Sequence, residues 1–112
     1  MMKKRFRIKK EHDFQLVFKK RKSFANRQFV IYLSDHPKTN HMRVGISVSK
    51  RLGNAVKRNK IKRRIRVFFQ KHQDRLEPKE YVVIARQPVS NMDYHEMEKS
   101  LVHVLKIAKC IK

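Results

Sequence analysis

The segment GNAVKRNKIKRRIR, residues 53–66, combines a helical pattern with an accumulation of positive charge. Asn54 follows a glycine and is a favourable N-cap, so we predict a helix over 55–71. Like-charged pairs four residues apart, such as Arg58 and Lys62, each destabilise an isolated helix by about 0.2–0.5 kcal/mol. Because the segment contains no acid to offset this repulsion, we predict that a partner outside the chain supplies negative charge.

At 100° per residue, the predicted helix has one apolar side and two cationic sides. The apolar side, which we expect to pack on a sheet, consists of Ile61, Ile65, Phe68, Phe69 and His72. One cationic stripe consists of Ala55, Asn59, Lys62 and Arg66, with Arg63 beside it, and the other of Lys57, Lys60, Arg64 and Lys71. Solvated helix faces usually mix both signs of charge, so this pattern favours a helix that lies between two nucleic-acid elements or along one.

The composition of the whole chain indicates the same kind of partner. Its 112 residues include 30 Lys and Arg but only 9 Asp and Glu, which gives a formal net charge of +21. The hydrophobic fraction of 40% is adequate for folding, so we expect residues 1–112 to form one binding domain. So strong a field favours a polyanion, with nucleic acid the first candidate and an anionic membrane surface a distant second.

Few features of the sequence indicate a membrane or export. No apolar run approaches the roughly 20 residues of a spanning helix. The basic start MMKKRFRIKK is not followed by the apolar stretch of a secretory signal. The single cysteine, Cys110, excludes an internal disulfide and is typical of a reducing cytosol. We therefore expect a cytoplasmic protein in which Cys110 is a reduced, partly buried thiol.

The segments around the central helix predict an α+β fold. Apolar residues on one side predict a short helix over 11–20. Alternation predicts strands over 27–34 and 42–49, and the continuous apolar run 80–86 predicts a central strand covered on both faces. A last helix begins near Asp93, with an apolar stripe of Met97, Leu101, Val104, Leu105 and Ala108. The order helix, two or three strands, helix, strand, helix predicts helices packed on a small sheet.

Three aromatic residues are candidates for contacts with bases. Phe14 and Phe18 lie one helical turn apart, and Tyr32 lies on the strand face opposite its apolar neighbours. Such side chains form stacking platforms for single-stranded nucleic acid, where each stacked base contributes about 1–3 kcal/mol. By composition alone the hydrophobic core is the commoner place for both phenylalanines, whereas Tyr32 carries a polar hydroxyl that suits a wet surface.

The sequence lacks the pattern of a protein-based nuclease. Such enzymes hold metal ions with clustered carboxylates or histidines, but the histidines here are scattered over positions 12, 36, 41, 72, 95 and 103. His36 and His41 share a predicted loop without the cysteine or acid cluster of a zinc site. The acids at 93–96 match a helix cap. We therefore predict no catalytic residue and no metal site in the polypeptide.

The segment RVGISVSKRLGNAVKRNKIKRRIR (43–66) closely resembles the protein subunit of bacterial ribonuclease P. The segments DFQLVFKKRKSFANRQFVIY (13–32) and EYVVIARQPVS (80–90) are similar to flanking parts of that family, so the resemblance covers nearly the whole chain. It implies a small α+β domain with a four-stranded mixed sheet and three helices in the order αβββαβα. It also implies a left-handed β-α-β crossover, as in the ribosomal protein S5 domain 2-like fold, against the usual preference.

The resemblance further implies a role in an RNA-based endonuclease. The family binds the catalytic ribonuclease P RNA, and together they remove the 5′ leader of precursor tRNA. Hydrolysis belongs to the RNA and to Mg²⁺ ions that the RNA mainly holds, while the protein grips the single-stranded leader. Outside this ribonucleoprotein we expect a monomer. A structural RNA-binding protein, such as a ribosomal protein, shares the composition; an aromatic cleft for a mobile strand is the feature that distinguishes the two classes.

Family positions fall on two sets of residues in this sequence. The resemblance implies binding of the leader of precursor tRNA by Phe14, Phe18, Tyr32, Lys50, Arg51, Asn59, Lys62 and Arg66. It implies binding of the catalytic RNA by Asn54, Lys57, Arg58, Lys60, Arg63 and Arg64. Two positions depart from the family pattern: Lys60 stands where many members have arginine, and Val67 stands where a polar or acidic residue is common. Lysine keeps the charge but lacks the two-pronged guanidinium.

Overall fold

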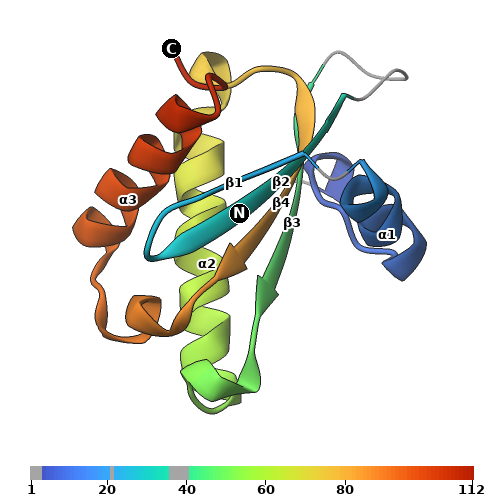
Figure 1. Cartoon of the computed structure of the whole chain (residues 1–112). Helices are drawn as coiled ribbons and strands as arrows, with labels where there is room; N and C mark the ends of the chain where they lie inside the picture. Colours follow the sequence, from blue (N-terminus) through green and yellow to red (C-terminus); the bar gives the residue numbers. More distant parts are fainter. Residues whose placement is uncertain (1–3, 21, 36–40) are drawn as a thin grey trace.

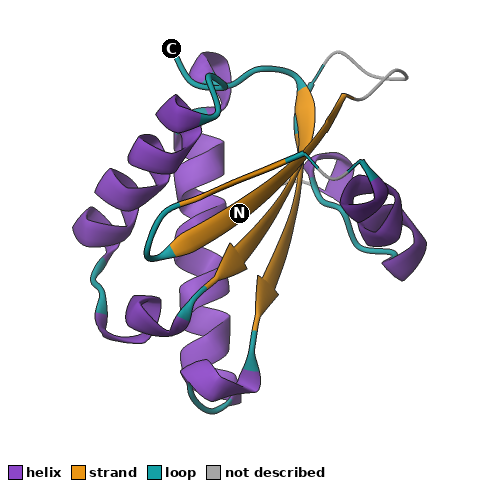
Figure 2. Ribbon diagram, in the orientation of Figure 1, coloured by secondary structure: helices purple, strands orange, loops and turns teal. Residues whose placement is uncertain are grey.

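The computed structural model describes residues 4–20, 22–35 and 41–112, which form an α+β domain with a four-stranded sheet (Figures 1 and 2). The helices and strands are α1 (Glu11–Lys19), β1 (Ser23–Ala25), β2 (Phe29–Asp35), β3 (Arg43–Val48), α2 (Ala55–Lys71), β4 (Lys79–Ala85) and α3 (Tyr94–Ile107). The described residues also form four short 3-10 helices: η1 (Lys4–Phe6) before α1, and η2 (Lys50–Leu52), η3 (Gln73–Arg75) and η4 (Gln87–Asn91) between later elements. The predicted order of helices and strands is confirmed, and β1 is the third strand that the sequence left open.

The strands lie in the order β1-β2-β4-β3. β2 pairs antiparallel with β1 and with β4, whereas β3 and β4 are parallel neighbours joined by α2. This β3–α2–β4 connection is left-handed, as the family resemblance implied and against the usual preference. As predicted, β4 is central, and the sheet is mixed.

Helices cover both faces of the sheet: α2 and α3 lie against one face and α1 against the other (Figure 1). The main core lies between the sheet and the pair α2–α3, where alternate residues of β2 and β4 meet the apolar sides of the two helices. Its largest fully buried side chains are Tyr81, Phe29, Phe68, Phe69, Ile31, Leu33, Ile65, Met97, Leu101 and Leu105. The predicted apolar sides of both long helices are therefore confirmed.

The start of α2 is fixed by its two preceding residues. Asn54 caps the helix by accepting a hydrogen bond from the Lys57 backbone N–H at 2.9 Å, as predicted. Gly53 has φ = 140°, a conformation that side-chain-bearing residues rarely adopt. A Cβ at this position would also lie 2.7 Å from Cδ of Lys57. The glycine therefore allows the sharp change of direction that turns the chain from η2 into α2.

The last helix begins with a capping box, as the acids at 93–96 suggested. The Asp93 carboxylate accepts from the Glu96 N–H at 2.8 Å, and the Glu96 carboxylate accepts from the Asp93 N–H at 3.1 Å. Beyond this helix, Cys110 is free and buried, and burial raises the pKa of its thiol. Among the described residues, no helix combines the length and the apolar character that crossing a bilayer requires.

Candidate nucleic-acid interface

The predicted aromatic residues meet on the sheet face that α1 covers. Val17 of α1, Val82 of β4 and Ile8 form a small buried cluster there. Partly buried side chains surround it: Phe14, Phe18, Tyr32 and Ile84. The rings of Phe18 and Tyr32 meet edge to face, with centroids 4.9 Å apart and an interplanar angle of 86°. The sequence left open whether these aromatic residues belong to the core or to an exposed platform. In the structure both descriptions apply in part, because each ring packs on the small cluster and keeps part of its surface accessible.

Phe14 lies close to the backbone of β3. A Cβ on Gly45 would lie 2.7 Å from Cε1 of Phe14, a distance that real side chains essentially never reach. The absent side chain therefore allows α1 to approach the sheet at this strand. The alternation of this strand predicted that Gly45 faces away from the main core, and this prediction is confirmed. The sequence did not show that Phe14 covers this glycine.

An arginine of β3 holds α1 in place. Arg43 donates to the Glu80 carboxylate of β4 at 2.9 Å and lies 3.4 Å from the Asp13 carboxylate of α1. All three side chains are partly shielded from solvent, so these bonds are stronger than those of exposed ion pairs. We call the surface formed by Phe14, Phe18, Tyr32 and the adjoining part of the sheet the α1 cleft, after the aromatic cleft that the sequence analysis expected on these residues.

One cationic flank of α2 faces the β3 edge of the sheet. At 100° per residue this flank consists of Arg58, Asn59, Lys62 and Arg66. Burial lowers the pKa of the Arg66 guanidinium, and the positive charge of Arg7 lowers it further. Arg7 is fixed at this edge because it pairs with Val44 of β3, and the next residue donates a backbone hydrogen bond to the Val44 carbonyl at 2.9 Å. Arg7 and Arg66 therefore add positive charge to the same edge of the sheet, beside β3.

Two members of this group were not assigned to the leader by the sequence analysis. Arg7 lies in the basic N-terminal stretch, which was considered only as a possible export signal. Arg58 was grouped with Lys57 and Lys60, but the helix places it on the flank of Lys62. The Nε atoms of Arg7 and Arg58 are shielded from solvent, and within the described parts of the chain neither has a hydrogen-bond partner. Each of these two Nε donors is therefore buried without an acceptor among the described residues.

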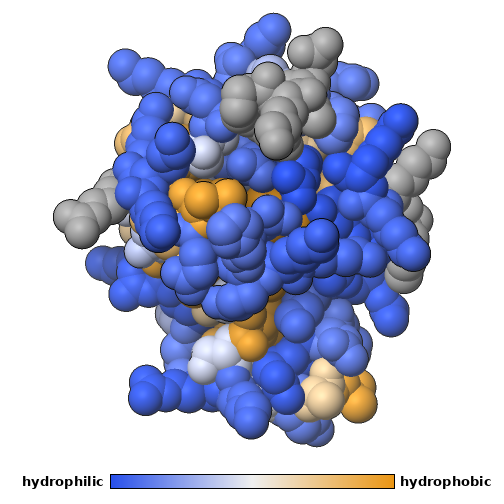
Figure 3. Space-filling view, turned by 90° about the vertical axis from the view of Figure 1, so that its right-hand side faces the viewer, coloured by the Kyte–Doolittle hydropathy of each residue, from blue (hydrophilic) through white to orange (hydrophobic). Residues whose placement is uncertain are grey.

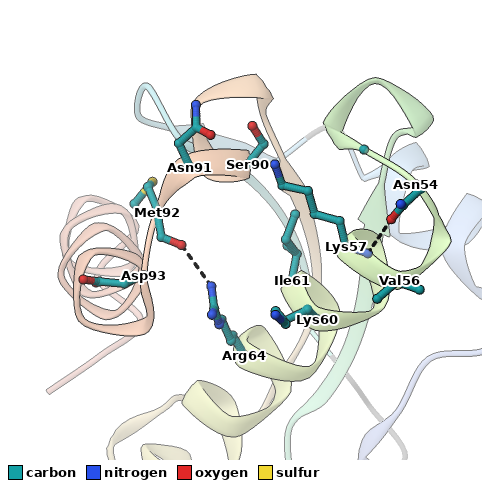
Figure 4. Close-up of a pocket in the computed structure, with 11 residues that line it drawn as sticks. Asn54, Val56, Lys57, Lys60, Ile61, Arg64, Ser90, Asn91, Met92 and Asp93 are labelled. Atoms are coloured by element: carbon teal, nitrogen blue, oxygen red, sulfur yellow. Dashed lines mark hydrogen bonds between the residues drawn. The ribbon is translucent and has the colours of Figure 1, made fainter.

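The other cationic flank of α2 lines an open pocket of about 730 Å³ (Figure 4). Lys57, Lys60 and Arg64 form one wall, and the end of η4 with the two residues that link it to α3 forms the other. Arg64 donates a hydrogen bond to the carbonyl oxygen of Met92 at 3.0 Å, which fastens the helix to this segment. We call this site the η4 pocket. Besides the residues already named, its lining consists of Gly53, Asn54, Val56, Ile61, Ser90, Asn91 and Asp93.

The remaining predicted residues lie near the two flanks. Lys50 and Arg51 are exposed in η2, directly after β3, where the Ser49 hydroxyl accepts from the Arg51 N–H at 3.2 Å. Arg63 is exposed on the outward side of α2, between the flanks. Lys71, which shares a stripe with Lys57, instead pairs with Glu98 of α3 at 3.1 Å.

The cationic side chains of α2 from Lys57 to Arg66 have no carboxylate within 4 Å in the described parts of the chain. Val67 is exposed and contributes no charge there. On the side of the molecule that carries α1, hydrophobic surface shows only as separate patches between long hydrophilic side chains (Figure 3). The uncompensated charge that the sequence indicated is therefore present on the folded surface. Within residues 4–20, 22–35 and 41–112, no group of three or more His, Cys, Asp or Glu side chains could hold a metal ion.

Comparison with known proteins identifies the family. The family model described as ribonuclease P matches residues 2–109. The chain belongs to the ribonuclease P protein family. The ribonuclease P protein component of Listeria welshimeri is 56% identical over 112 residues, which cover 99% of this chain and 94% of the relative.

Two solved ribonuclease P proteins share the fold. The Staphylococcus aureus protein has a TM-score of 0.90 at 53% identity, covering 96% of this chain and 98% of its own. The Thermotoga maritima protein has a TM-score of 0.81 at 31% identity, covering 90% of this chain and 96% of its own. The predicted ribonuclease P protein fold is thus confirmed.

Proposed function

We propose that this chain is the protein component of a bacterial ribonuclease P, in which it binds the catalytic RNA and the 5′ leader of precursor tRNA. The observation that carries this proposal is the arrangement of α2, whose two cationic flanks lack carboxylate partners within the described residues. A helix with two such flanks suits simultaneous contact with two separate stretches of RNA backbone. Membership of the ribonuclease P protein family and the relatives' names support the same role.

The α1 cleft and the adjacent flank of α2 suit the single-stranded leader. Phe18 and Tyr32 present parts of two rings on which unpaired bases stack, a mode of binding that does not depend on base identity. Lys62 and Arg66 lie on the helix flank at the same sheet edge and neutralise leader phosphates. Lys50 and Arg51 extend the positive charge beyond the end of β3.

The polypeptide supplies binding energy, and the RNA supplies the chemistry. In this proposal the Mg²⁺ ions of the holoenzyme are held mainly by the RNA. The protein acts by neutralising phosphates that would otherwise repel one another, which raises the affinity for precursor tRNA. We further propose a cytoplasmic protein that is monomeric outside the ribonucleoprotein.

Reconstitution tests this function. A transcript of a bacterial ribonuclease P RNA is assayed for 5′ cleavage of precursor tRNA at a low Mg²⁺ concentration, with and without the protein. Added protein is expected to restore cleavage, while the protein alone leaves precursor tRNA intact. Absence of any stimulation, together with absence of binding to the transcript, would exclude the proposed role. Cleavage by the protein without RNA would contradict the assignment of chemistry to the RNA.

A further inference from the structure

A further group of lysines lies at the rim of the sheet, outside both flanks of α2. It surrounds a recess of about 170 Å³ that is lined by Lys20, Lys22, Leu33, Ser34, Asp35 and Lys79. Lys20 directly follows α1, Lys22 directly precedes β1, and Lys79 begins β4. Because β3 and β4 are parallel, the first residue of β4 lies at the opposite end of the sheet from η2 and the start of α2. We call this site the lysine recess.

The lysines reach the recess from both faces of the sheet. Burial raises the pKa of the Cys110 thiol, and the charges of Lys79 and Lys22 oppose that rise, so both lie within electrostatic range of this sulfur in the main core. Lys20 reaches the recess from the end of α1, which covers the other face (Figure 1). The lysine recess therefore spans the rim where the two faces meet.

The lysine recess keeps a net positive charge. Its one acid, Asp35, lies 3.7 Å from the Lys79 ammonium group, and the Asp35 side chain is 88% exposed. An ion pair exposed to this degree is weak, because water screens it. Lys20 and Lys22 have no carboxylate within 4 Å among the described residues. An anion placed between these like charges would relieve their repulsion.

The size and the donors of the recess favour a single phosphate group. Its volume of about 170 Å³ lies below the roughly 300–1,000 Å³ of small-molecule sites, which favours a compact anion over a whole nucleotide. The Ser34 hydroxyl donates to the Asp35 carbonyl at 3.2 Å, so the lysines supply the donors of the recess. Each ammonium group carries three donors and no acceptor, and lysine binds phosphate as a point charge.

The lysine recess adjoins the α1 cleft on two elements. Lys20 follows Phe18 by two residues at the end of α1, and Ser34 follows Tyr32 by two residues along β2. Residues two apart in a strand face the same side and lie about 7 Å from each other. A single strand with bases on Phe18 and Tyr32 can therefore place its next phosphate at the rim of the sheet.

We propose that the lysine recess binds one phosphate of the 5′ leader, at a nucleotide farther from the cleavage site than those that stack in the α1 cleft. This inference rests on the proposed function and extends the leader site to three lysines without a role in it. The distal direction follows from the fold, because the recess lies at the opposite end of the sheet from the start of α2, where the proposed contacts with the catalytic RNA begin.

The test replaces the leader phosphates one at a time by uncharged methylphosphonate linkages, in precursors bound by the holoenzyme with full-length protein. A linkage that Lys22 contacts should matter in wild type and no longer matter in Lys22→Ala, since the two changes remove the same interaction. Lys19→Ala removes the same charge from the end of α1, and Lys99→Ala removes it from an exposed position of α3. Both lie outside the recess and are matched controls. Thermal unfolding confirms that each variant is folded.

We expect one distal linkage to weaken wild-type binding by about fivefold when it is made neutral. Lys22→Ala should weaken binding of the unmodified long-leader precursor to a similar degree and abolish the effect of that linkage, whereas both controls should retain it. Asp35→Asn, which removes the competing carboxylate, should strengthen binding of the same precursor.

A leader in which no linkage depends on Lys22, or an equal dependence on Lys19, would overturn the lysine recess as a phosphate site. Weaker binding of Lys22→Ala to the ribonuclease P RNA transcript, with leader affinity unchanged, would also overturn it by assigning these lysines to the catalytic RNA. The proposed function survives both results if the wild-type holoenzyme still binds a long-leader precursor more tightly than one with a minimal leader. Equal affinity of the wild-type holoenzyme for the two precursors would overturn both the recess and the proposed binding of the leader.

Discussion

At the scale of single residues, the α1 cleft depends on side chains that pack and remain partly accessible. Phe18 and Tyr32 contact each other edge to face and cover Val17 and Val82, which are fully buried. Packing fixes the ring orientations before a ligand arrives, so little side-chain entropy is lost when a base stacks on them. A preformed aromatic pair of this kind is the arrangement that we expect in a protein that binds a mobile single strand.

Replacing Phe18 by alanine is expected to weaken binding of a precursor tRNA with a leader of several nucleotides by about tenfold, since one stacked base contributes about 1–3 kcal/mol. A precursor with a minimal leader should bind the reconstituted holoenzyme as before. The two dissociation constants provide the measurement, and Leu16→Ala, an exposed apolar position on the same helix, is the control. Equal losses for both precursors would exclude the stacking role of Phe18.

Arg7 provides a second prediction at this scale. Its guanidinium lies close enough to Arg66 to lower the pKa of that residue, and its shielded Nε has no partner within the described chain. A phosphate between the two arginines would neutralise their repulsion. Arg7→Ala is therefore expected to weaken binding of the long-leader precursor and to reduce the salt dependence of that binding by about one phosphate contact.

The matched control for Arg7→Ala is Lys9→Ala, which removes one positive charge two residues away from an exposed position. Titrations of the holoenzyme with precursor tRNA at several salt concentrations give both the affinity and its salt dependence. If the two variants behave alike, Arg7 contributes only to the general positive field and binds no particular phosphate.

At the scale of helices, the C-terminal half of α2 is held to α3 by Glu98. Hydrogen bonds from His72 at 2.9 Å and Lys71 at 3.1 Å lower the pKa of the Glu98 carboxyl to about 2. The Tyr94 hydroxyl donates to the same carboxylate at 3.3 Å. These contacts pair Lys71 with a carboxylate of the protein, whereas Lys57 and Lys60 on the same stripe have no carboxylate within 4 Å among the described residues. One end of the stripe therefore stabilises the packing of α2 on α3, and we expect the other end to contact RNA.

The Glu98 cluster predicts a particular dependence of stability on pH. Because the folded-state pKa lies below the ordinary value of 4.5, the stabilisation is present above pH 4.5 and is lost as the pH falls towards 2. Glu98→Gln should therefore unfold at a lower urea concentration than wild type near neutral pH, and the difference should narrow below pH 4.5. Asp74→Asn, at an exposed carboxylate outside the cluster, is the control. A difference that stays constant with pH would contradict the assignment.

The helices and strands could largely be predicted because their patterns are local. The bounds 55–71 of α2 follow from the Asn54 cap and the apolar spacing, and the central place of β4 follows from its continuous apolar run. The left-handed crossover came only from the family resemblance, because alternation and helical periodicity carry no information on handedness. Strand β1 is three residues long, which is too short for its pattern to stand out.

The candidate site could be predicted only in part, because it depends on contacts between distant segments. The two cationic stripes of α2 were readable, since both lie on one helix. The pairing of Arg7 with β3 and the wall that η4 adds to the pocket join residues far apart in the chain. The contact between Phe14 and Gly45 is likewise tertiary. A glycine in an alternating strand indicates that another group can approach closely, but it does not show which group does so.

At the scale of the whole molecule, the fold separates the two candidate binding surfaces. Helix α1, which carries part of the α1 cleft, lies against one face of the sheet, and α2 lies against the other (Figure 1). The η4 pocket lies between α2 and the start of α3 (Figure 4). The main core holds both surfaces in a fixed relation, because the same apolar side of α2 supports both flanks. A rigid spacing of this kind would let one small domain align a leader with the RNA that cuts it.

The formal charge of +21 makes the last prediction one about salt. If the flank of the η4 pocket and the outward arginines neutralise about five phosphates of the catalytic RNA, raising the salt from 50 to 200 mM should weaken binding by about 10²–10³-fold. Lys60→Ala should lower the slope of log Kd against log salt by about one, whereas Lys99→Ala should leave it nearly unchanged. Filter binding or fluorescence titration across that range provides both slopes. A response that is flat for wild-type protein would mean that the positive field does not contact phosphate, and the cationic flanks of α2 would then need another explanation.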